Sequence, residues 1–380
     1  MVTSGATRLH CRQGEFQLQR YPRRTPEPLQ AWCGADRLLL DAVGSSGETL
    51  VVNDEHGTLS VALQPRAVWT DSALSAQAMR ENCERNRRDT PELVWSTEQP
   101  RGRFDRVVVR IPKQLAYFEY QLAQLANHLA PGTELYFAGM DKHLSPHTAQ
   151  KIERYFGTVE RHRGQQKARL FSALQGASRR PVTDDFYSHY YCPHLKADLC
   201  ALPNVFSRDQ LDIGSRLLLD NLARVQPANQ VADLACGNGV LGIAALQQKL
   251  ATEVTFIDES AMAVASTRAN CTRVLETEGS ATFHHGDGLI AIGKRFDLIL
   301  CNPPFHLSHA VDDFAGRRLL RQCAQSLQPG GELVLVANRH LGYRETLQRS
   351  FADVEQLARS NKFIVWRARS SCQVGEGQLC

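Results

Sequence analysis

Four consecutive residues, Asn302, Pro303, Pro304 and Phe305, carry the strongest chemical signal in this 380-residue sequence. They end an apolar run, 296–302, that is typical of a buried strand. Because proline has no N–H and a fixed φ, the strand must stop there, with its last carbonyl directed into the crevice where open α/β sheets bind ligands. The Asn302 side chain and the Pro303 carbonyl are acceptors for a planar NH2 group, and the Phe305 ring can stack on a base.

A glycine-rich loop lies upstream, in the string DLACGNG (233–239), which is followed by Gly242. Glycines at 237, 239 and 242 let the backbone approach a ligand closely at the start of a helix. Asp258 ends the next predicted strand, where a carboxylate can accept both hydroxyls of a ribose. Asp287 follows the third strand and can accept from an adenine amino group, although an ordinary turn aspartate explains it equally well. The pattern predicts a cofactor that contains adenosine.

Dinucleotides and S-adenosylmethionine both contain adenosine, and the residues around Asn302 separate them. A nicotinamide enzyme needs a catalytic histidine, tyrosine or lysine and has no use for an Asn-Pro-Pro-Phe string. Methylation of an exocyclic or amide nitrogen needs acceptors for the amino protons and an aligned methyl donor, but no strong base. The residues therefore favour S-adenosylmethionine, with a nucleic-acid base or a protein glutamine as the methyl acceptor.

These residues need a parallel sheet to bring them together. Strands are predicted at 231–236, 253–258, 281–285, 296–302 and 332–338, and helices at 240–250, 260–273, 312–327 and 342–350. The alternation is typical of a doubly wound α/β domain, and the Pro-Gly-Gly at 329–331 predicts a turn before the fifth strand.

The chain also repeats itself. Strings at 37–41, 70–83, 103–112 and 131–135 resemble strings at 216–220, 257–271, 295–304 and 329–333, in the same order and with a steadily growing offset. We therefore expect two tandem Rossmann-like domains, each a doubly wound, mostly parallel sheet. The expected boundaries are 1–175 for the first domain, 176–200 for an inter-domain segment, 201–371 for the second domain and 372–380 for a tail.

The first copy has lost the chemical signals. Its counterpart of the glycine loop, NDEHGTL (53–59), keeps only Gly57, and its counterpart of the Asn-Pro-Pro-Phe string is RIPK (110–113). Arg110 and Lys113 would repel a sulfonium and attract a phosphate, so we expect this domain to hold RNA. Other candidate RNA contacts are basic residues that could form one face: Arg101, Arg103, Lys142, Arg161, Arg163, Lys167 and Arg169.

Composition narrows the class of protein. The net charge is +4, and its excess falls in residues 1–190, which mildly favours a polyanionic partner. Eleven cysteines without a C-x-x-C pair argue against a disulfide framework and a zinc ribbon, so we expect reduced thiols and no metal. Cys301 should face away from the crevice as a core thiol. No signal peptide or membrane span is apparent, which predicts a cytoplasmic location without membrane attachment.

Taken in order, DLACGNG, Asp258, the Gly-Asp-Gly around Asp287 and the NPPF string resemble class I S-adenosylmethionine-dependent methyltransferases that methylate nitrogen. Strings at 204–219, 257–266, 301–306 and 336–341 resemble the large-subunit ribosomal RNA guanine-N2 methyltransferase G family, a close relative of the small-subunit guanine-N2 enzymes. The resemblance implies a catalytic second copy that methylates guanine N2 in 23S rRNA.

The resemblance also implies roles for particular residues. Asp233, Cys236, Gly237, Gly239, Asp258 and Asp287 would bind the cofactor, Asn302 to Phe305 would bind the base, and a segment containing Asn204, Phe206, Ser207 and Arg208 would close over the site, with Phe206 and Arg208 contacting RNA. Three alternatives remain at this stage: guanine-N2 methylation of 16S rRNA, glutamine N5 methylation of a protein, and a non-catalytic RNA-binding assembly factor.

Overall fold

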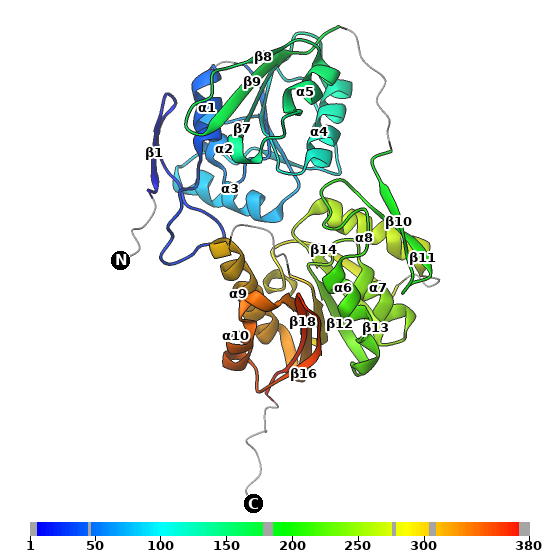
Figure 1. The fold of residues 1–380 in the computed structure, drawn as a ribbon. Helices are drawn as coiled ribbons and strands as arrows, with labels where there is room; N and C mark the ends of the chain where they lie inside the picture. The colour runs from blue at the N-terminus through cyan, green and yellow to red at the C-terminus, as the bar shows by residue number, and fades with distance from the viewer. Residues whose placement is uncertain (1–5, 45–46, 178–184, 276–278, 304–308, 372–380) are drawn as a thin grey trace, which may run out of the picture. The chain divides into compact units, whose positions relative to one another are not determined.

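The chain divides into two compact units, Met1–Phe186 and Tyr187–Cys380, in this computed structural model. The division falls inside the predicted inter-domain segment 176–200. The structure describes residues 6–44, 47–177, 185–275, 279–303 and 309–371, with the backbone alone for 309–313 (Figure 1). Pro304, Phe305 and the tail 372–380 lie outside the described residues.

The first unit is built around a seven-stranded sheet in the order β5-β4-β3-β6-β7-β9-β8. The strands from β5 to β7 run parallel, and β9 is antiparallel to both of its neighbours. The strands are β3 (Thr49–Val52), β4 (Ala67–Thr70), β5 (Glu92–Trp95), β6 (Arg106–Arg110), β7 (Glu134–Met140), β8 (Val159–Arg161) and β9 (Ala168–Leu174). A short hairpin, β1 (Arg8–Cys11) and β2 (Gly14–Gln17), precedes them.

Helices cover both faces of this sheet. They are α1 (Gly34–Ala42), α2 (Thr58–Leu63), α3 (Ala73–Arg85), α4 (Leu115–His128) and α5 (Thr148–Phe156). Apolar residues of α1, α2 and α3 form one core cluster together with residues of the hairpin. On the other face, Phe137 of β7 packs against Phe118 of α4 and Phe156 of α5. The central strands are therefore buried on both sides, which explains their continuous valine runs.

The second unit repeats this plan in the order β14-β13-β12-β15-β16-β18-β17. The strands from β14 to β16 are parallel and β18 is antiparallel to both of its neighbours. The strands are β12 (Ala228–Leu234), β13 (Ala251–Asp258), β14 (Ala281–His285), β15 (Phe296–Cys301), β16 (Leu327–Asn338), β17 (Asp353–Arg359) and β18 (Phe363–Arg369). A hairpin, β10 (Ser188–Cys192) and β11 (Ala197–Ala201), comes first.

The helices of the second unit are α6 (Ile213–Leu219), α7 (Val240–Gln247), α8 (Ala261–Val274), α9 (His309–Ser326) and α10 (Tyr343–Ser350). One core cluster joins the sheet to α6, α7, α8 and the hairpin, and another joins the opposite face to α9 and α10. Cys301 belongs to the second cluster, 1% exposed, so the prediction of a core thiol is confirmed.

The predicted pair of doubly wound domains is confirmed. The Pro-Gly-Gly at 329–331 differs from the expected turn, because β16 already begins at Leu327. Phe296 of β15 pairs with Leu327, but Leu298 pairs with Glu332, so the residues between form an irregular bulge within the strand. The part of the chain that the structure describes contains no helix long and apolar enough to cross a membrane.

Candidate active site of the second unit

The candidate site lies where the strand order reverses. Leu234, the last residue of β12, pairs with Cys301, the last residue of β15. The glycine loop and Asn302 therefore leave the sheet at neighbouring positions on its carboxyl edge. In open α/β sheets this switch point is the usual place for a ligand.

The three glycines of the loop are glycine for two different reasons. Gly237 has φ +58°, and a Cβ there would meet nothing within 4 Å. Gly239 precedes α7 with φ +83°, and a Cβ would lie 2.6 Å from the Thr267 side chain. Gly242 lies within α7, where a Cβ would lie 2.4 Å from the ring of Phe256. Gly239 and Gly242 allow close packing, whereas Gly237 borders open space that a ligand can enter.

Asp258 is fixed at the end of β13 by backbone donors. Its two carboxylate oxygens accept from the N–H of Gly237 at 2.9 Å and from the N–H of Ser260 at 3.0 Å. This links the strand end directly to the glycine loop. An adenosine whose ribose met Asp258 would reach the open side of Gly237, so these residues fit the cofactor that the sequence predicts.

Asp233 and Cys236 lie deeper than this surface. The Asp233 carboxylate, 1% exposed, accepts from the N–H of Gly242 at 2.8 Å, and burial raises the pKa of Asp233 to about 8. The buried Cys236 thiol contacts the Thr267 hydroxyl at 3.4 Å, and burial raises the pKa of Cys236 well above its usual value. Both side chains are buried beneath the glycine loop and support it, and their predicted contacts with the cofactor remain predictions.

Asn302 has a defined amide orientation. Its Nδ2 donates to Asp212 Oδ2 at 3.0 Å and to Ser215 Oγ at 2.8 Å. Its Oδ1 is buried and meets no hydrogen-bond donor among the described residues. Pro303, also buried, follows at once. The amide therefore presents an unsatisfied acceptor at the edge of the sheet, beside the glycine loop, and a buried acceptor without a donor is costly unless a ligand supplies one.

Asp287 has a partner that the sequence did not reveal. Both of its carboxylate oxygens accept from the guanidinium of Arg318 on α9, one of them at 2.7 Å from Nη1. The two side chains are about one-fifth exposed. Such a two-point contact fixes the carboxylate. The predicted contact of Asp287 with an adenine amino group would have to coexist with this ion pair.

The segment before α6 carries the predicted RNA contacts. Phe206 is 49% exposed, and Arg208 forms an ion pair with Asp209 at 3.4 Å. Two residues that the sequence interpretation missed, Asp212 and Ser215, lie just beyond. Their Asp-x-x-Ser spacing before an apolar run is a helix-capping signal, and the Ser215 N–H does donate to the Asp212 carboxylate at 2.9 Å.

The first unit lacks the features that suit a cofactor. Its loop after β3 ends at Gly57, which precedes α2 in the left-handed conformation as Gly239 precedes α7. Glu55 and His56 therefore occupy the places of Gly237 and Asn238, and burial lowers the pKa of His56 to about 4.

The first unit also lacks a counterpart of the Asp258 carboxylate. Ser72 caps α3 as Ser260 caps α8, and each serine donates its backbone N–H to the side chain of the residue two positions earlier. That residue is Thr70 in the first unit and Asp258 in the second. The sequence repeat had matched Asp258 with Asp71 instead, which is one position too late.

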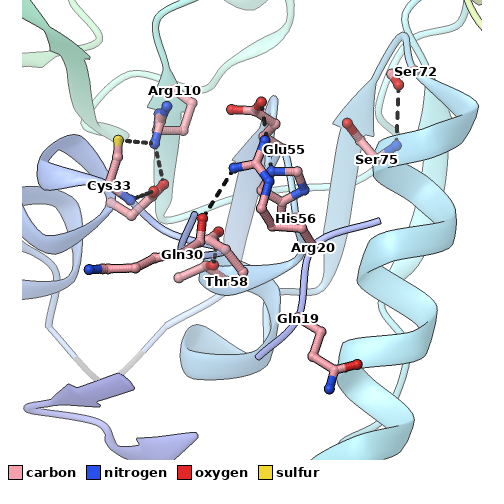
Figure 2. Close-up of polar contacts among 12 residues, drawn as sticks. Gln19, Arg20, Gln30, Cys33, Glu55, His56, Thr58, Ser72, Ser75 and Arg110 are labelled. Atoms are coloured by element: carbon pink, nitrogen blue, oxygen red, sulfur yellow. Dashed lines mark hydrogen bonds and ion pairs between the residues drawn. The ribbon is translucent and has the colours of Figure 1, made fainter. Parts of the chain in front are cut away.

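Arg110 is placed differently from the sequence expectation. Its side chain is 14% exposed and contacts the Asp36 carboxylate at 2.5 Å and Cys33 Sγ at 3.0 Å (Figure 2). Burial opposes the charge, but the neighbouring Asp36 outweighs it and holds the pKa of Arg110 above its ordinary value. Asp36 thus neutralises the guanidinium inside the domain, and the predicted contact of Arg110 with RNA would have to coexist with this ion pair.

The other basic candidates lie at the surface. Lys113, Lys142, Arg101, Arg103, Arg163 and Lys167 are exposed, as are Arg161 and Arg169. Of these, Arg161 pairs with Glu153 and Arg169 with Asp141. Within the described ranges, no group of three or more histidine, cysteine, aspartate or glutamate side chains is arranged to hold a metal ion.

Comparison with known proteins identifies both units. Residues 196–367 match the methyltransferase small domain and residues 6–177 match the RLMG N-terminal domain. The chain is 42% identical over 385 residues to the ribosomal RNA large subunit methyltransferase G of Alcanivorax borkumensis, covering 96% of this chain and 97% of that protein. It is 42% identical over 365 residues to the protein of the same name from Pseudomonas aeruginosa strain UCBPP-PA14, covering 93% and 97%.

Among solved structures, the chain resembles a Thermus thermophilus 16S rRNA N2 G1207 methyltransferase in complex with AdoMet and guanosine. The TM-score is 0.79, with 23% identity over 96% of this chain and 97% of that one, which supports the fold alone. The predicted resemblance is confirmed by the sequence matches: the chain belongs to the ribosomal RNA large subunit methyltransferase G family.

Proposed function

We propose that this chain transfers a methyl group from S-adenosylmethionine to the exocyclic N2 of a specific guanine in 23S ribosomal RNA. The observation that carries the proposal is the Asn302 amide. Both of its N–H groups are used within the protein, and its buried Oδ1 is left as an acceptor at the switch point of the sheet. An amino group is the complementary donor.

The glycine loop and Asp258 give the cofactor its place. The open side of Gly237 admits the backbone approach that the cofactor needs, and Asp258 stands at the adjoining strand end to accept ribose hydroxyls. S-adenosylmethionine, when bound, supplies a sulfonium methyl group. Since Asn302 leaves the sheet beside this loop, an amino group on its Oδ1 would lie next to the methyl donor.

The chemistry asks little of the protein beyond position. Asn302 Oδ1 accepts one amino proton and holds it out of conjugation, which frees the nitrogen lone pair for in-line attack. The N–CH3 bond forms as the S–CH3 bond breaks, and the nitrogen then loses a proton to water. Asn302 has no proton to give up or take, so it orients the nitrogen and is not a general base.

The choice of RNA as the methyl acceptor is based on the names of related proteins. The relatives are named for methylation of large-subunit ribosomal RNA, and the Thermus protein of similar fold is named for guanine N2. These names favour guanine N2 in 23S rRNA over a protein glutamine, whose planar NH2 group the Asn302 acceptor would fit equally well. We place the reaction in the cytoplasm, where ribosomes are assembled, and propose that Phe206 and Arg208 contact the RNA.

The first unit is proposed to hold RNA rather than to methylate. Glu55 and Thr70 replace two features that a cofactor needs, and the exposed Lys113 and Lys142 remain available to phosphates.

Labelled methyl transfer tests the proposal. The enzyme is incubated with methyl-labelled S-adenosylmethionine and, in parallel, naked 23S rRNA, naked 16S rRNA, partly assembled large subunits and a protein substrate of glutamine N5 methylation. Nucleosides and amino acids are then separated. N2-methylguanosine from 23S rRNA or the large subunit supports the proposal, whereas label only in 16S rRNA, in methylglutamine or in no product contradicts it.

A further inference from the structure

The two units share one contact whose residues have been exchanged. In each, the residue at the carboxyl end of the fourth strand, Asn302 or Arg110, reaches the first turn of the helix that precedes the sheet. In each, the partners are the residue that caps the helix and the residue three positions later. The repeated RLLLD string, 37–41 and 216–220, fixes this correspondence.

The carboxylate has changed places between the copies. In the second unit, the capping residue is Asp212 and the later residue is Ser215. In the first unit, the capping residue is Cys33 and the later residue is Asp36, whose carboxylate accepts from the Cys33 N–H at 2.7 Å. Each carboxylate both caps its helix and binds the strand-end side chain. The contact therefore persists in a copy without the cofactor features, but with a cation in place of the amide.

We infer that Asp212 and Ser215 are positioning residues that set the direction of the Asn302 amide in the second unit. The inference rests on the proposed function, because it explains how the acceptor for the target amino group is kept available. An asparagine amide can turn by half a rotation and exchange its oxygen for its NH2 group. The Asp212 carboxylate can only accept, so the reverse orientation would bring Oδ1 against Asp212 Oδ2. The Ser215 hydroxyl adds a second acceptor for Nδ2 in the observed orientation.

The burial of Ser215 and the glycine at position 214 support this inference. Ser215 is 5% exposed, so its hydroxyl has little competition from water. A Cβ at Gly214 would lie 2.9 Å from Asp212 Oδ2, the oxygen that binds Asn302, and would crowd it. The matching residue of the first unit is Ala35, where the capping side chain is a cysteine.

Asp212 also adds charge to the contact. A hydrogen bond from Nδ2 to a carboxylate polarises the amide and makes Oδ1 a stronger acceptor. Asp212→Asn keeps an oxygen that can cap α6 and accept from Asn302 but removes the charge. Asp212→Ala removes the cap of α6, the acceptor for Asn302 and the charge. Ser215→Ala removes only the acceptor that Ser215 Oγ provides.

The test compares single-turnover methyl transfer to 23S rRNA, cofactor affinity and thermal unfolding for Asp212→Ala, Ser215→Ala and the double variant. Removing one hydrogen bond should slow transfer about five- to tenfold, and removing both on the order of fiftyfold, with cofactor affinity changed less than about twofold. Asp212→Asn should recover part of the rate lost in Asp212→Ala. Ser72→Ala, which removes the cap of α3 in the first unit, is the matched control and should leave the rate unchanged (Figure 2).

A spectroscopic readout keeps this inference separable from the proposed function. In protein labelled with 15N-asparagine, the side-chain signal of Asn302 is identified by its absence from Asn302→Asp. Its amide protons should exchange slowly in the wild type and at least about tenfold faster in the double variant. Slow exchange in both, or an unchanged transfer rate in the double variant, would overturn the inference. If the Asn302 amide protons exchange faster in the double variant but the wild type methylates no RNA, only the proposed function is overturned.

Discussion

Replacing Gly237 by alanine tests whether the open side of the glycine loop is a ligand site. The Gly237 backbone is left-handed, with φ +58°, and a methyl group there meets no protein atom within 4 Å. Gly242→Ala is the matched variant, because its methyl group would lie 2.4 Å from the buried Phe256 ring and 2.9 Å from Val254.

The predicted cofactor affinities separate the two variants. Alanine in a left-handed conformation costs about 1–2 kcal/mol, so Gly237→Ala should lower the free energy of unfolding by that amount only. Its methyl group should also keep the cofactor from the backbone. The loss of one charge-assisted hydrogen bond between the loop backbone and the cofactor, about 1.5–3 kcal/mol, would weaken cofactor binding about 10- to 150-fold. Gly242→Ala should cost about 1–3 kcal/mol or more through overpacking and leave the affinity of the folded fraction within about threefold.

The assay is titration calorimetry with S-adenosylhomocysteine alongside denaturant unfolding, both at a temperature where each variant is folded. Full cofactor affinity in Gly237→Ala would refute the claim that the cofactor lies against this glycine. A loss of unfolding free energy in Gly237→Ala well above about 2 kcal/mol would show instead that the position is packed.

Four further predictions follow from named contacts. Asp258→Ala should weaken cofactor binding at least about tenfold by calorimetry, because it removes the proposed ribose acceptor and the anchor of the loop. Arg110→Ala should destabilise the first unit by about 3–5 kcal/mol in denaturant unfolding, since it leaves Asp36 buried without its partner. Replacing both by apolar residues should restore only part of the stability, because Asp36 also caps α1. Lys113→Glu should reduce RNA affinity in filter binding, and the effect should shrink as salt rises. Burial raises the pKa of Asp233 to about 8, so this carboxyl ionises at lower pH in the unfolded chain than in the folded protein, and the free energy of unfolding should fall as pH rises from about 4 to 8. Asp233→Asn should flatten that slope in unfolding measured at both ends of the range. An unchanged slope would contradict the burial argument.

The sequence was sufficient to predict which residues of the second unit meet at one edge of its sheet. Parallel strands place their carboxyl ends on one edge, so the sequence alone brings Asn302 and the glycine loop together. The same argument placed Cys301 on the opposite face, because side chains alternate along a strand.

Contacts between elements distant in sequence could not be predicted in this way. Asn302 and Asp212 are 90 positions apart, and Arg318 and Asp287 are 31 apart, so each pairing depends on how a helix packs against the sheet. The capping spacing of Asp212 and Ser215 was readable, but its second role was not. The ion pair of Arg110 with the buried Asp36 was hidden for the same reason, because these residues are 74 positions apart.

Asn302→Ala measures the central claim most directly. The variant and the wild type are compared for single-turnover methyl transfer to 23S rRNA and for the dissociation constant of S-adenosylhomocysteine. Our account predicts that transfer of methyl to guanine N2 is lost, on the order of a hundredfold or more, while the dissociation constant stays within about twofold, because Oδ1 faces the amino group and not the cofactor. Near-normal transfer, or a matching loss of cofactor binding, would contradict it.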